Sequence, residues 1–183
     1  MPIPPSRLAR MLEVEQKYRA DIDRVREDLL KIGAVLLEKK EEVDIYFQHP
    51  CRDFAKTDEA LRVRRSGSDV EVSYKGPRMS SAVKTRLELT ASAEGDVEAM
   101  LEALGFRKVA VIKKRREYYA YGSLTVSLDS VEGLGDFVEI EALASSEASV
   151  KDAEAEIEAL AGRLGLREKV DETYLELYLR SRA

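Results

Sequence analysis

The sequence predicts an α+β fold in a single domain, made of strands with one charged face and of amphipathic helices. Apolar and charged residues alternate in several short segments, which is the pattern of strands. Three longer stretches instead repeat apolar residues every three to four positions and end at a glycine, as helices do. With 183 residues, 44% of them hydrophobic, the chain can bury one sizeable core. Because no linker rich in Pro, Gly or Ser divides it, we expect residues 1–183 to form one domain.

Each of the three predicted helices carries one apolar stripe. They span residues 21–32, 96–104 and 149–164, and Gly33, Gly105 and Gly165 follow them. The stripe of the second helix is expected to bury Met100 and Leu104 together with Val97 and Leu101. Near the end of the chain, residues 171–180 predict a short helix that either packs on the strands or plugs one end of their assembly.

Two parts of the chain resemble each other. Residues 25–47 align without a gap on residues 97–119, which matches Val25 with Val97 and Gly33 with Gly105. This similarity indicates an internal duplication of a unit made of strand, helix and hairpin. Chance similarity between two amphipathic helices is the alternative explanation.

The first strand carries a row of charged side chains. Strand alternation places Glu13, Glu15 and Lys17 on one face. A carboxylate pair can hold a hard divalent cation, and a neighbouring lysine can bind the phosphate oxygens that the cation carries. In an ordinary sheet such a face meets water. In a closed barrel it would line the lumen, and the apolar faces would pack outward against helices.

The same alternation recurs along the later strands. The bases expected on this face are Lys17, Arg62, Arg64, Lys75, Lys84, Arg86, Lys113 and Arg115, and the acids are Glu13, Glu15, Glu88, Asp129, Glu139 and Glu141. Because an unpaired buried charge is strongly unfavourable, a lumen of this kind would need ion pairs, water and a polyanion with its cations. A linear triphosphate meets that need, since Arg and Lys can hold its oxygens while Mg²⁺ or Mn²⁺ bridges them to carboxylates.

Six segments, which together span most of the chain, carry a resemblance to a known family. They are EVEQK at 13–17, VDIYF at 43–47, RDFAKTDEALRVR at 52–64, YKGP at 74–77, KKRR at 113–116 and LDSVEGLGDFVEIE at 128–141. In this order they resemble the CYTH superfamily of class IV adenylyl cyclases and thiamine triphosphatases, the triphosphate tunnel metalloenzymes. The first segment matches the ExExK signature of that family.

The resemblance implies an eight-stranded antiparallel β-barrel with helices packed outside and a tunnel that holds a triphosphate. The metal, Mg²⁺ or Mn²⁺, would be bound by Glu13, Glu15, Glu139 and Glu141, with Asp129 nearby. The phosphates would be held by Lys17, Arg62, Arg64, Lys75, Arg86, Lys113 and Arg115, of which Lys17 and Arg115 are the expected catalytic residues. Thr90 departs from the family pattern, which often has an acidic residue there, and this puts in doubt a metal or pairing role on that strand.

The function implied by the resemblance is a divalent-metal-dependent enzyme that acts on a triphosphate. The expected activity is that of a class IV adenylyl cyclase, which converts ATP to 3′,5′-cyclic AMP and pyrophosphate. Chain length and the Gly-Leu-Gly sequence after Asp129 favour it. A triphosphatase that hydrolyses thiamine triphosphate or inorganic tripolyphosphate is the first alternative. A non-catalytic sensor of polyphosphate or nucleotides is the second.

Composition excludes several other classes. A net charge of −5 argues against a general nucleic-acid-binding protein, which usually carries excess Lys and Arg. The single cysteine, Cys51, excludes an intramolecular disulfide and suits a reducing compartment. No apolar run reaches the roughly 20 residues of a membrane span, and residues 1–11 have no signal-peptide core. We therefore expect a cytoplasmic protein without membrane or nucleic-acid partners. The apolar residues outside the barrel suit helices or the second subunit of a homodimer equally well.

Overall fold

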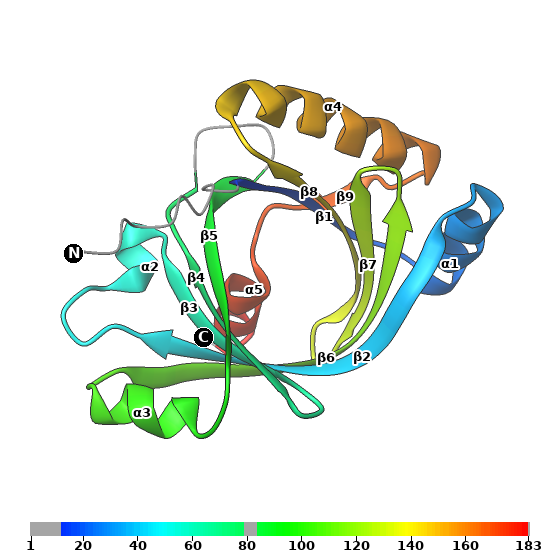
Figure 1. Cartoon of the computed structure of the whole chain (residues 1–183). Helices are drawn as coiled ribbons and strands as arrows, with labels where there is room; N and C mark the ends of the chain where they lie inside the picture. Colours follow the sequence, from blue (N-terminus) through cyan, green and yellow to red (C-terminus); the bar gives the residue numbers. More distant parts are fainter. Residues whose placement is uncertain (1–11, 79–83, 183) are drawn as a thin grey trace, which may run out of the picture.

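The strands close into one antiparallel barrel in the computed structural model, which describes residues 12–78 and 84–182 (Figure 1). The strand order is β5-β4-β3-β2-β6-β7-β8-β1, and pairing of β1 with β5 closes the ring. The strands are β1 (Leu12–Arg19), β2 (Val35–Gln48), β3 (Ala60–Ser66), β4 (Asp69–Lys75), β5 (Lys84–Ala93), β6 (Arg107–Tyr121), β7 (Leu124–Val131) and β8 (Gly135–Ala144). The predicted eight-stranded barrel with outer helices is therefore confirmed.

Five helices and one extra strand complete the described part of the chain. They are α1 (Ile22–Lys31), α2 (Phe54–Thr57), α3 (Val97–Ala103), α4 (Glu147–Arg163), α5 (Tyr174–Arg180) and β9 (Glu168–Val170). The short strand β9 pairs with the end of β1 that β5 leaves unpaired. Among the described residues, no helix is both long enough and apolar enough to cross a membrane.

The helices begin and end where local chemistry requires it. Helix α1 begins after Asp21, whose carboxylate accepts hydrogen bonds from the backbone N–H groups of Asp23 and Arg24. It stops before Gly33, whose φ of +87° is a conformation that favours glycine. Helix α4 begins earlier than predicted, because Ser146 caps it through the backbone N–H of Ser149.

The main hydrophobic core lies outside the barrel wall, beneath the helices. Val25 and Leu29 of α1 and Ile157 of α4 are fully buried against outward-facing residues such as Val126 and Ile140. Helix α4 covers β1 and β8, as Figure 1 shows at the top of the view. The apolar faces of these strands therefore point outward, which leaves the charged faces for the interior.

Helix α3 buries less than its sequence predicts. Val97 and Leu101 pack into a smaller core with residues of β2, β3 and β4. Met100 and Leu104, which were expected to be buried, are 56% and 64% exposed. The helix has only 7 residues and contacts the barrel along one narrow stripe, so its remaining apolar side chains face outward.

The strand pairing supports the internal duplication. If β1, β2, β3 and β4 are exchanged with β5, β6, β7 and β8, respectively, every pair of neighbouring strands in the ring remains a pair of neighbours. In the alignment that matches Val25 with Val97, the counterpart of Glu42 is Lys114. These two residues lie directly opposite each other in the β2–β6 ladder. The two halves are thus related by an approximate two-fold axis that passes between them.

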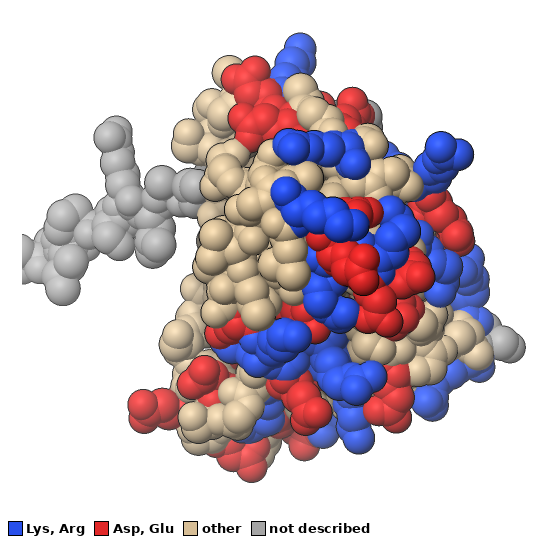
Figure 2. Space-filling view, turned by 90° about the vertical axis from the view of Figure 1, so that its right-hand side faces the viewer, with Lys and Arg blue, Asp and Glu red and all other residues tan. Residues whose placement is uncertain are grey.

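Charges of both signs cover the side of the barrel that carries α1 and β7. Figure 2 shows acidic and basic side chains interleaved on this face, with no large area of one sign. Several are paired, including Arg24 with Asp28 at 3.0 Å and Arg26 with Glu117 at 2.9 Å. A surface of this kind lacks the basic stripe that nucleic-acid-binding proteins use for phosphate contacts.

Helix α5 plugs one end of the barrel, which is one of its two predicted placements, and is visible through the ring in Figure 1. Its Tyr174 and Leu177 are buried against Tyr46 and Ile112, which belong to the inward faces of β2 and β6. The Tyr174 hydroxyl donates a hydrogen bond of 2.5 Å to Asp129 Oδ2.

We predict that Tyr174→Phe lowers the free energy of unfolding by about 1–3 kcal/mol, because it removes a hydrogen bond from a fully buried carboxylate. Urea denaturation would measure the change. Tyr178→Phe on the same helix, where the side chain is only half-buried, is the matched control. Equal losses in both variants would mean that the Tyr174 hydroxyl does not hold the plug.

Candidate functional site

The barrel encloses a cavity of about 700 Å³. Inward-facing residues of the strands line it, together with residues of α2 and α5. The predicted site residues in the lining are Glu13, Glu15, Lys17, Arg62, Arg64, Lys75, Arg86, Glu88, Glu139 and Glu141. The backbone of Lys84 lies in β5, but its side chain is outside the described part. The structure thus brings most of the predicted set together in one cavity.

The prediction for β6 is wrong by one residue. Lys113 and Arg115 are exposed on the outer face of the barrel, so neither can contact a ligand in the tunnel. Lys114 and Arg116 line the cavity instead, and they are only 4% and 6% exposed. Residues 113–116 are all basic, so their sequence does not show which of them face inward. That choice is made by the pairing of β6 with β2, which places Glu42 opposite Lys114.

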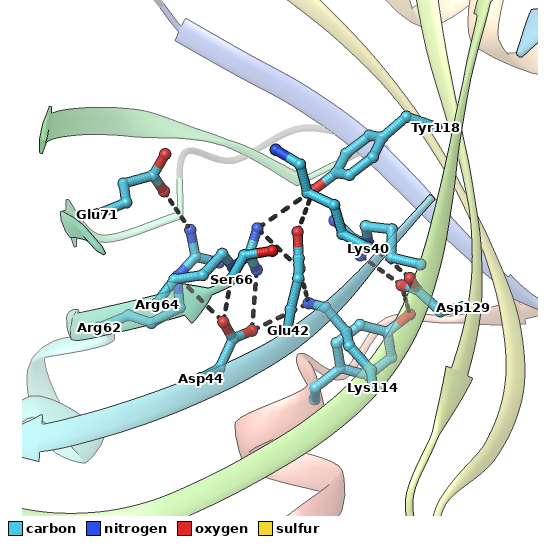
Figure 3. A network of polar contacts seen from close by, with 12 residues as sticks. Lys40, Glu42, Asp44, Arg62, Arg64, Ser66, Glu71, Lys114, Tyr118 and Asp129 are labelled. Carbon is cyan, nitrogen blue, oxygen red and sulfur yellow. Dashed lines mark hydrogen bonds and ion pairs between the residues drawn. The ribbon is translucent and has the colours of Figure 1, made fainter. Parts of the chain in front are cut away.

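Cationic side chains of the tunnel wall lie around Asp44 of β2 (Figure 3). Arg64 binds it through both oxygens, with Nε at 2.6 Å from Oδ1 and a terminal nitrogen at 2.9 Å from Oδ2. The Lys114 ammonium lies 2.9 Å from Oδ2. Burial alone would raise the pKa of Asp44, but Lys114 and Arg62 hold it well below its ordinary value. The carboxylate therefore stays ionised and fixes the cations in place.

Glu42 is the second acidic residue of this group. Its Oε1 accepts a 2.6 Å hydrogen bond from the Tyr118 hydroxyl, and its Oε2 lies 3.2 Å from Arg64 and 3.4 Å from Lys114. Burial of the Tyr118 hydroxyl raises its pKa to about 12, so it remains a donor. Sequence reasoning missed Glu42 and Asp44 as site residues. The alternation of Asp44 and Tyr46 was the one available signal, because residues 38–42 are all charged.

A second ion-pair group joins the cavity to the plug. Arg116 contacts both Asp129 and Glu139. The Lys17 ammonium lies 3.2 Å from Glu139 Oε1, donates to the Glu172 carbonyl at 3.2 Å, and sits 3.9 Å from the centre of the Tyr174 ring. Lys17 is only 2% exposed, so its ammonium interacts with groups of the protein interior and hardly with bulk water.

Asp129 occupies a different position from the one predicted. It is fully buried, is not part of the cavity lining, and has its oxygens bound by Arg116 and Tyr174. Its place in the structure is that of an anchor between the barrel wall and α5.

The remaining carboxylates cluster on β1, β5 and β8, and the lysine that the described contacts place among them is Lys75. Lys75 lies 2.8 Å from Glu13 and 3.1 Å from Glu88. Glu15 and Glu141 are cross-strand neighbours in the β1–β8 ladder, which is an unfavourable arrangement for like charges. Burial and the nearby Glu13 and Glu15 raise the pKa of Glu141 to about 8. Among the described side chains, four carboxylates (Glu13, Glu15, Glu88 and Glu141) lie with two cations, Lys75 and Arg86, so negative charge is in excess here.

The carboxylate cluster has the chemistry of a divalent-cation site. Within the described residues, no three acidic side chains are already gathered closely enough to hold an ion. Directly paired residues of an antiparallel ladder have Cβ atoms only about 5 Å apart, however, so Glu15 and Glu141 need only small side-chain adjustments to share a ligand. Carboxylate oxygens are the donors that Mg²⁺ and Mn²⁺ prefer. Glu13, Glu15 and Glu141 thus fit a metal that would neutralise their surplus charge.

Arg62 has unused hydrogen-bonding capacity. It lies 3.2 Å from Glu71, but its Nε has no hydrogen-bond partner among the described residues. The same is true of the hydroxyl of Ser73, its cross-strand neighbour on β4. The next residue in this row is Thr90, which is exposed and lines the cavity. The row thus contains a guanidinium and two hydroxyls, of which that of Ser73 is fully buried, with no acid at position 90.

Comparison with known proteins places this site in a family context. The model of the CYTH domain matches residues 11–174. A Methanocaldococcus jannaschii protein named provisionally as an adenylate cyclase is 44% identical over 135 residues, which cover 72% of this chain and 77% of that protein. Adenylate cyclase CyaB of Aeromonas hydrophila is 36% identical over 160 residues, which cover 84% of this chain and 81% of that protein.

Solved structures share the fold. The PH1819 protein of Pyrococcus horikoshii has a TM-score of 0.85 and 40% identity, covering 93% of this chain and 99% of that one. HpAC1 of Hippeastrum, for which a dominant triphosphatase activity is described, has a TM-score of 0.70 and 16% identity. The likeness to HpAC1 covers 93% of this chain and 96% of that one.

The two faces of β6 provide a direct test of the phosphate-binding site. Lys114→Met and Arg116→Met should each weaken binding of tripolyphosphate by roughly 1.5–3 kcal/mol, the scale of hydrogen bonds to charged groups. Their outward-facing neighbours supply matched controls, and Lys113→Met and Arg115→Met should change binding by less than about 0.5 kcal/mol. Calorimetric titration in a calcium buffer would measure all four. Larger losses in the outward pair would reverse the assignment of faces.

The raised pKa of Glu141 predicts a stability difference that depends on pH. Without divalent cations, the folded protein keeps a proton on this carboxyl up to about pH 8, whereas the unfolded chain releases it near the ordinary value of 4.5. Stability from that proton is present below 4.5 and is lost as pH rises toward 8. Glu141→Gln should therefore melt more than about 2 °C above the unmodified protein at pH 8.5, and close to it at pH 4.

Thermal melts across this pH range would test the difference. Glu132→Gln, at an exposed position between β7 and β8, is the control and should follow the unmodified protein. A constant offset between Glu141→Gln and the unmodified protein at every pH would contradict the raised pKa.

Proposed function

Because the chain belongs to the CYTH family, we propose that it is a divalent-metal-dependent enzyme that converts ATP to 3′,5′-cyclic AMP and pyrophosphate. One observation carries the proposal. A single cavity places a cationic wall, formed by Arg64, Lys114 and Arg116, together with a carboxylate cluster that contains Glu15 and Glu141. Cations that grip phosphate oxygens and carboxylates that hold metal are the two parts that enzymes acting on a triphosphate need.

The charge balance of the cavity favours a substrate that enters with metal. Among the described lining residues, carboxylates outnumber lysines and arginines. A triphosphate alone would add more charge of the sign already in excess. Glu13, Glu15 and Glu141 would hold Mg²⁺ or Mn²⁺, and the bound metal would supply positive charge beside the phosphates.

The residues of the chain would act mainly by positioning and by electrostatic stabilisation. Arg64 and Lys114 are preorganised by Asp44, so they would meet phosphate oxygens with little loss of side-chain freedom. Arg62 would offer its Nε, which has no hydrogen-bond partner among the described residues. Lys17, held against Glu139 and Tyr174, would place its ammonium beside the charge that develops on the phosphates. Arg115, the other expected catalytic residue, lies outside the barrel and takes no part in this scheme.

The reaction itself is a displacement at phosphorus. The 3′-oxygen of the ribose attacks the α-phosphorus as its hydroxyl proton passes to water, and the bond from that phosphorus to the oxygen shared with the β-phosphorus breaks. Pyrophosphate departs with the bonding electron pair. The cationic wall would hold the departing β- and γ-phosphates, where negative charge accumulates.

Relatives support the cyclase and also one alternative. The names of the M. jannaschii and A. hydrophila proteins favour cyclisation of ATP. The triphosphatase activity described for HpAC1, on the same fold, favours hydrolysis as the second candidate. In that reaction water would attack the terminal phosphorus, and the same cations would hold the other phosphates.

Product analysis would separate these candidates. The protein would be incubated with ATP, thiamine triphosphate or tripolyphosphate in Mg²⁺ or Mn²⁺, and the products resolved by chromatography. Cyclic AMP with pyrophosphate is the expected result. Release of orthophosphate without cyclic AMP would assign the protein as a triphosphatase. Binding of all three without turnover would leave the sensor alternative.

We predict that Glu13→Gln and Glu15→Gln each reduce turnover by about 100-fold or more, because each replaces an anionic oxygen with a neutral one at nearly constant volume. The melting temperature of Glu15→Gln should not fall, since the change relieves repulsion with Glu141, whereas Glu13→Gln also removes one carboxylate partner of Lys75 and leaves it Glu88. Glu41→Gln, on the outer face of β2, should keep full activity. Unchanged turnover and unchanged metal dependence in both inner variants would remove the metal from this strand.

A further inference from the structure

Helix α3 and the strand β6 that follows it leave apolar side chains uncovered on the outside of the barrel. Met100 and Leu104 lie one helical turn apart at α3, so they share a face, and they are 56% and 64% exposed. Val111 is an outward-facing residue of β6, which α3 contacts, and it is 37% exposed. Exposed apolar side chains gathered on one surface mark sites of protein–protein interaction.

The internal duplication shows which neighbour α3 lacks. Its counterpart α1 shares one core with α4, and Arg24 of α1 donates a hydrogen bond to the Leu164 carbonyl at the end of α4. The counterpart of Leu104 is Ile32, which packs against that core. The core beneath α3 contains no residue of another helix within the described part of the chain. Figure 1 shows α3 apart from both α1 and α4, so nothing equivalent to α4 covers it.

The same surface carries charges of both signs. Lys113 and Arg115 follow Val111 on the outer face of β6, and neither side chain has a hydrogen bond or an ion pair among the described residues. Asp96 lies one helical turn before Met100 on the same face of α3 and is exposed. Its Oδ1 accepts a hydrogen bond from the backbone N–H of Ala99, but the carboxylate has no ion pair within the described ranges. The helix thus presents an acid, and the strand presents bases.

The two stripes also match in spacing. Residues two apart on a strand are separated by about 7 Å, and residues four apart on a helix by about 6 Å. If Met100 of one copy packs on Val111 of a second copy, Asp96 of the first therefore lies beside Lys113 of the second. Each copy supplies both stripes, so a two-fold axis repeats the contact. The surface is complementary to itself in apolar character and in charge.

We propose that this surface is the interface of a homodimer, in which α3 of each copy packs on the outer face of β6 of the other. A second copy supplies at once the apolar side chains for the centre and both signs of charge for the rim, which is the usual anatomy of an interface. A standard interface covers roughly 800 Å² per partner, and the apolar centre here is small, so we expect a dimer that dissociates on dilution. Met100, Leu104 and Val111 do not line the tunnel cavity.

Sedimentation velocity over a wide range of protein concentrations would test the proposal with the full chain. The unmodified protein should be a dimer at high concentration and a monomer on dilution. Leu104→Glu places a carboxylate in the apolar centre twice per dimer, so it should raise the dissociation constant about ten-fold or more. Leu30→Glu is the matched control, because Leu30 is 55% exposed on the counterpart helix α1. It should leave the dissociation constant unchanged.

Charge reversal on β6 gives a second test that leaves the apolar centre intact. Lys113→Glu combined with Arg115→Glu sets acids against Asp96 of the partner, so it should also weaken the dimer about ten-fold at low salt. Added NaCl should strengthen association of this variant and weaken that of the unmodified protein, because salt screens repulsion in the first and attraction in the second. Circular dichroism would verify that each variant is folded.

Two results would overturn the proposal. One is an unmodified protein that stays monomeric at every concentration. The other is a dimer that neither Leu104→Glu nor the charge reversal weakens, because its interface would then lie elsewhere on the molecule.

Discussion

Pairing of charges inside the barrel is the constraint on which the rest of this structure depends. A strand that turns its polar face inward removes Asp, Glu, Lys and Arg from bulk water, and a buried charge without a partner is strongly destabilising. Asp44 meets this constraint with Arg64 and Lys114, and Asp129 does so with Arg116. Because each carboxylate contacts two or more donors, the cations are held in fixed positions. The interactions that stabilise the buried charges also fix the positions of the cations that we propose to bind phosphate.

Carboxylates are not equally neutralised along the tunnel, and this difference distinguishes two regions of the cavity. Carboxylates on β2 and β7 lie among arginines and lysines, which keep the pKa of Asp44 low. Those on β1 and β8 lie beside one another, and burial together with Glu13 and Glu15 raises the pKa of Glu141 to about 8. In the first region, we propose that phosphate oxygens take over some of the contacts that arginines and lysines make with these carboxylates. The second has more carboxylates than cations among the described side chains, so a divalent cation is the partner that we propose would complete it.

The sequence predicted each charged face wherever apolar and charged residues strictly alternate. This holds for Glu13, Glu15 and Lys17, and for Arg62 and Arg64, all of which line the cavity. It fails where several consecutive residues are charged, because alternation then carries no information. Residues 113–116 are all basic and residues 38–42 are all charged, so the inward phase of β6 and β2 comes from their mutual pairing. That pairing is a long-range property, which one strand cannot specify.

The long-range pairing follows in turn from the duplication. The approximate two-fold axis brings β1 beside its counterpart β5, and it sets Glu42 directly against its counterpart Lys114. The two copies share a scaffold but not a charge pattern. β1 presents two glutamates and then Lys17 toward the plug, whereas β5 presents Arg86, Glu88 and then Thr90 toward the opposite end. Two copies with the same inward row would distribute charge symmetrically about the axis. Divergence between these rows therefore places different charges on the two sides of the axis within one cavity.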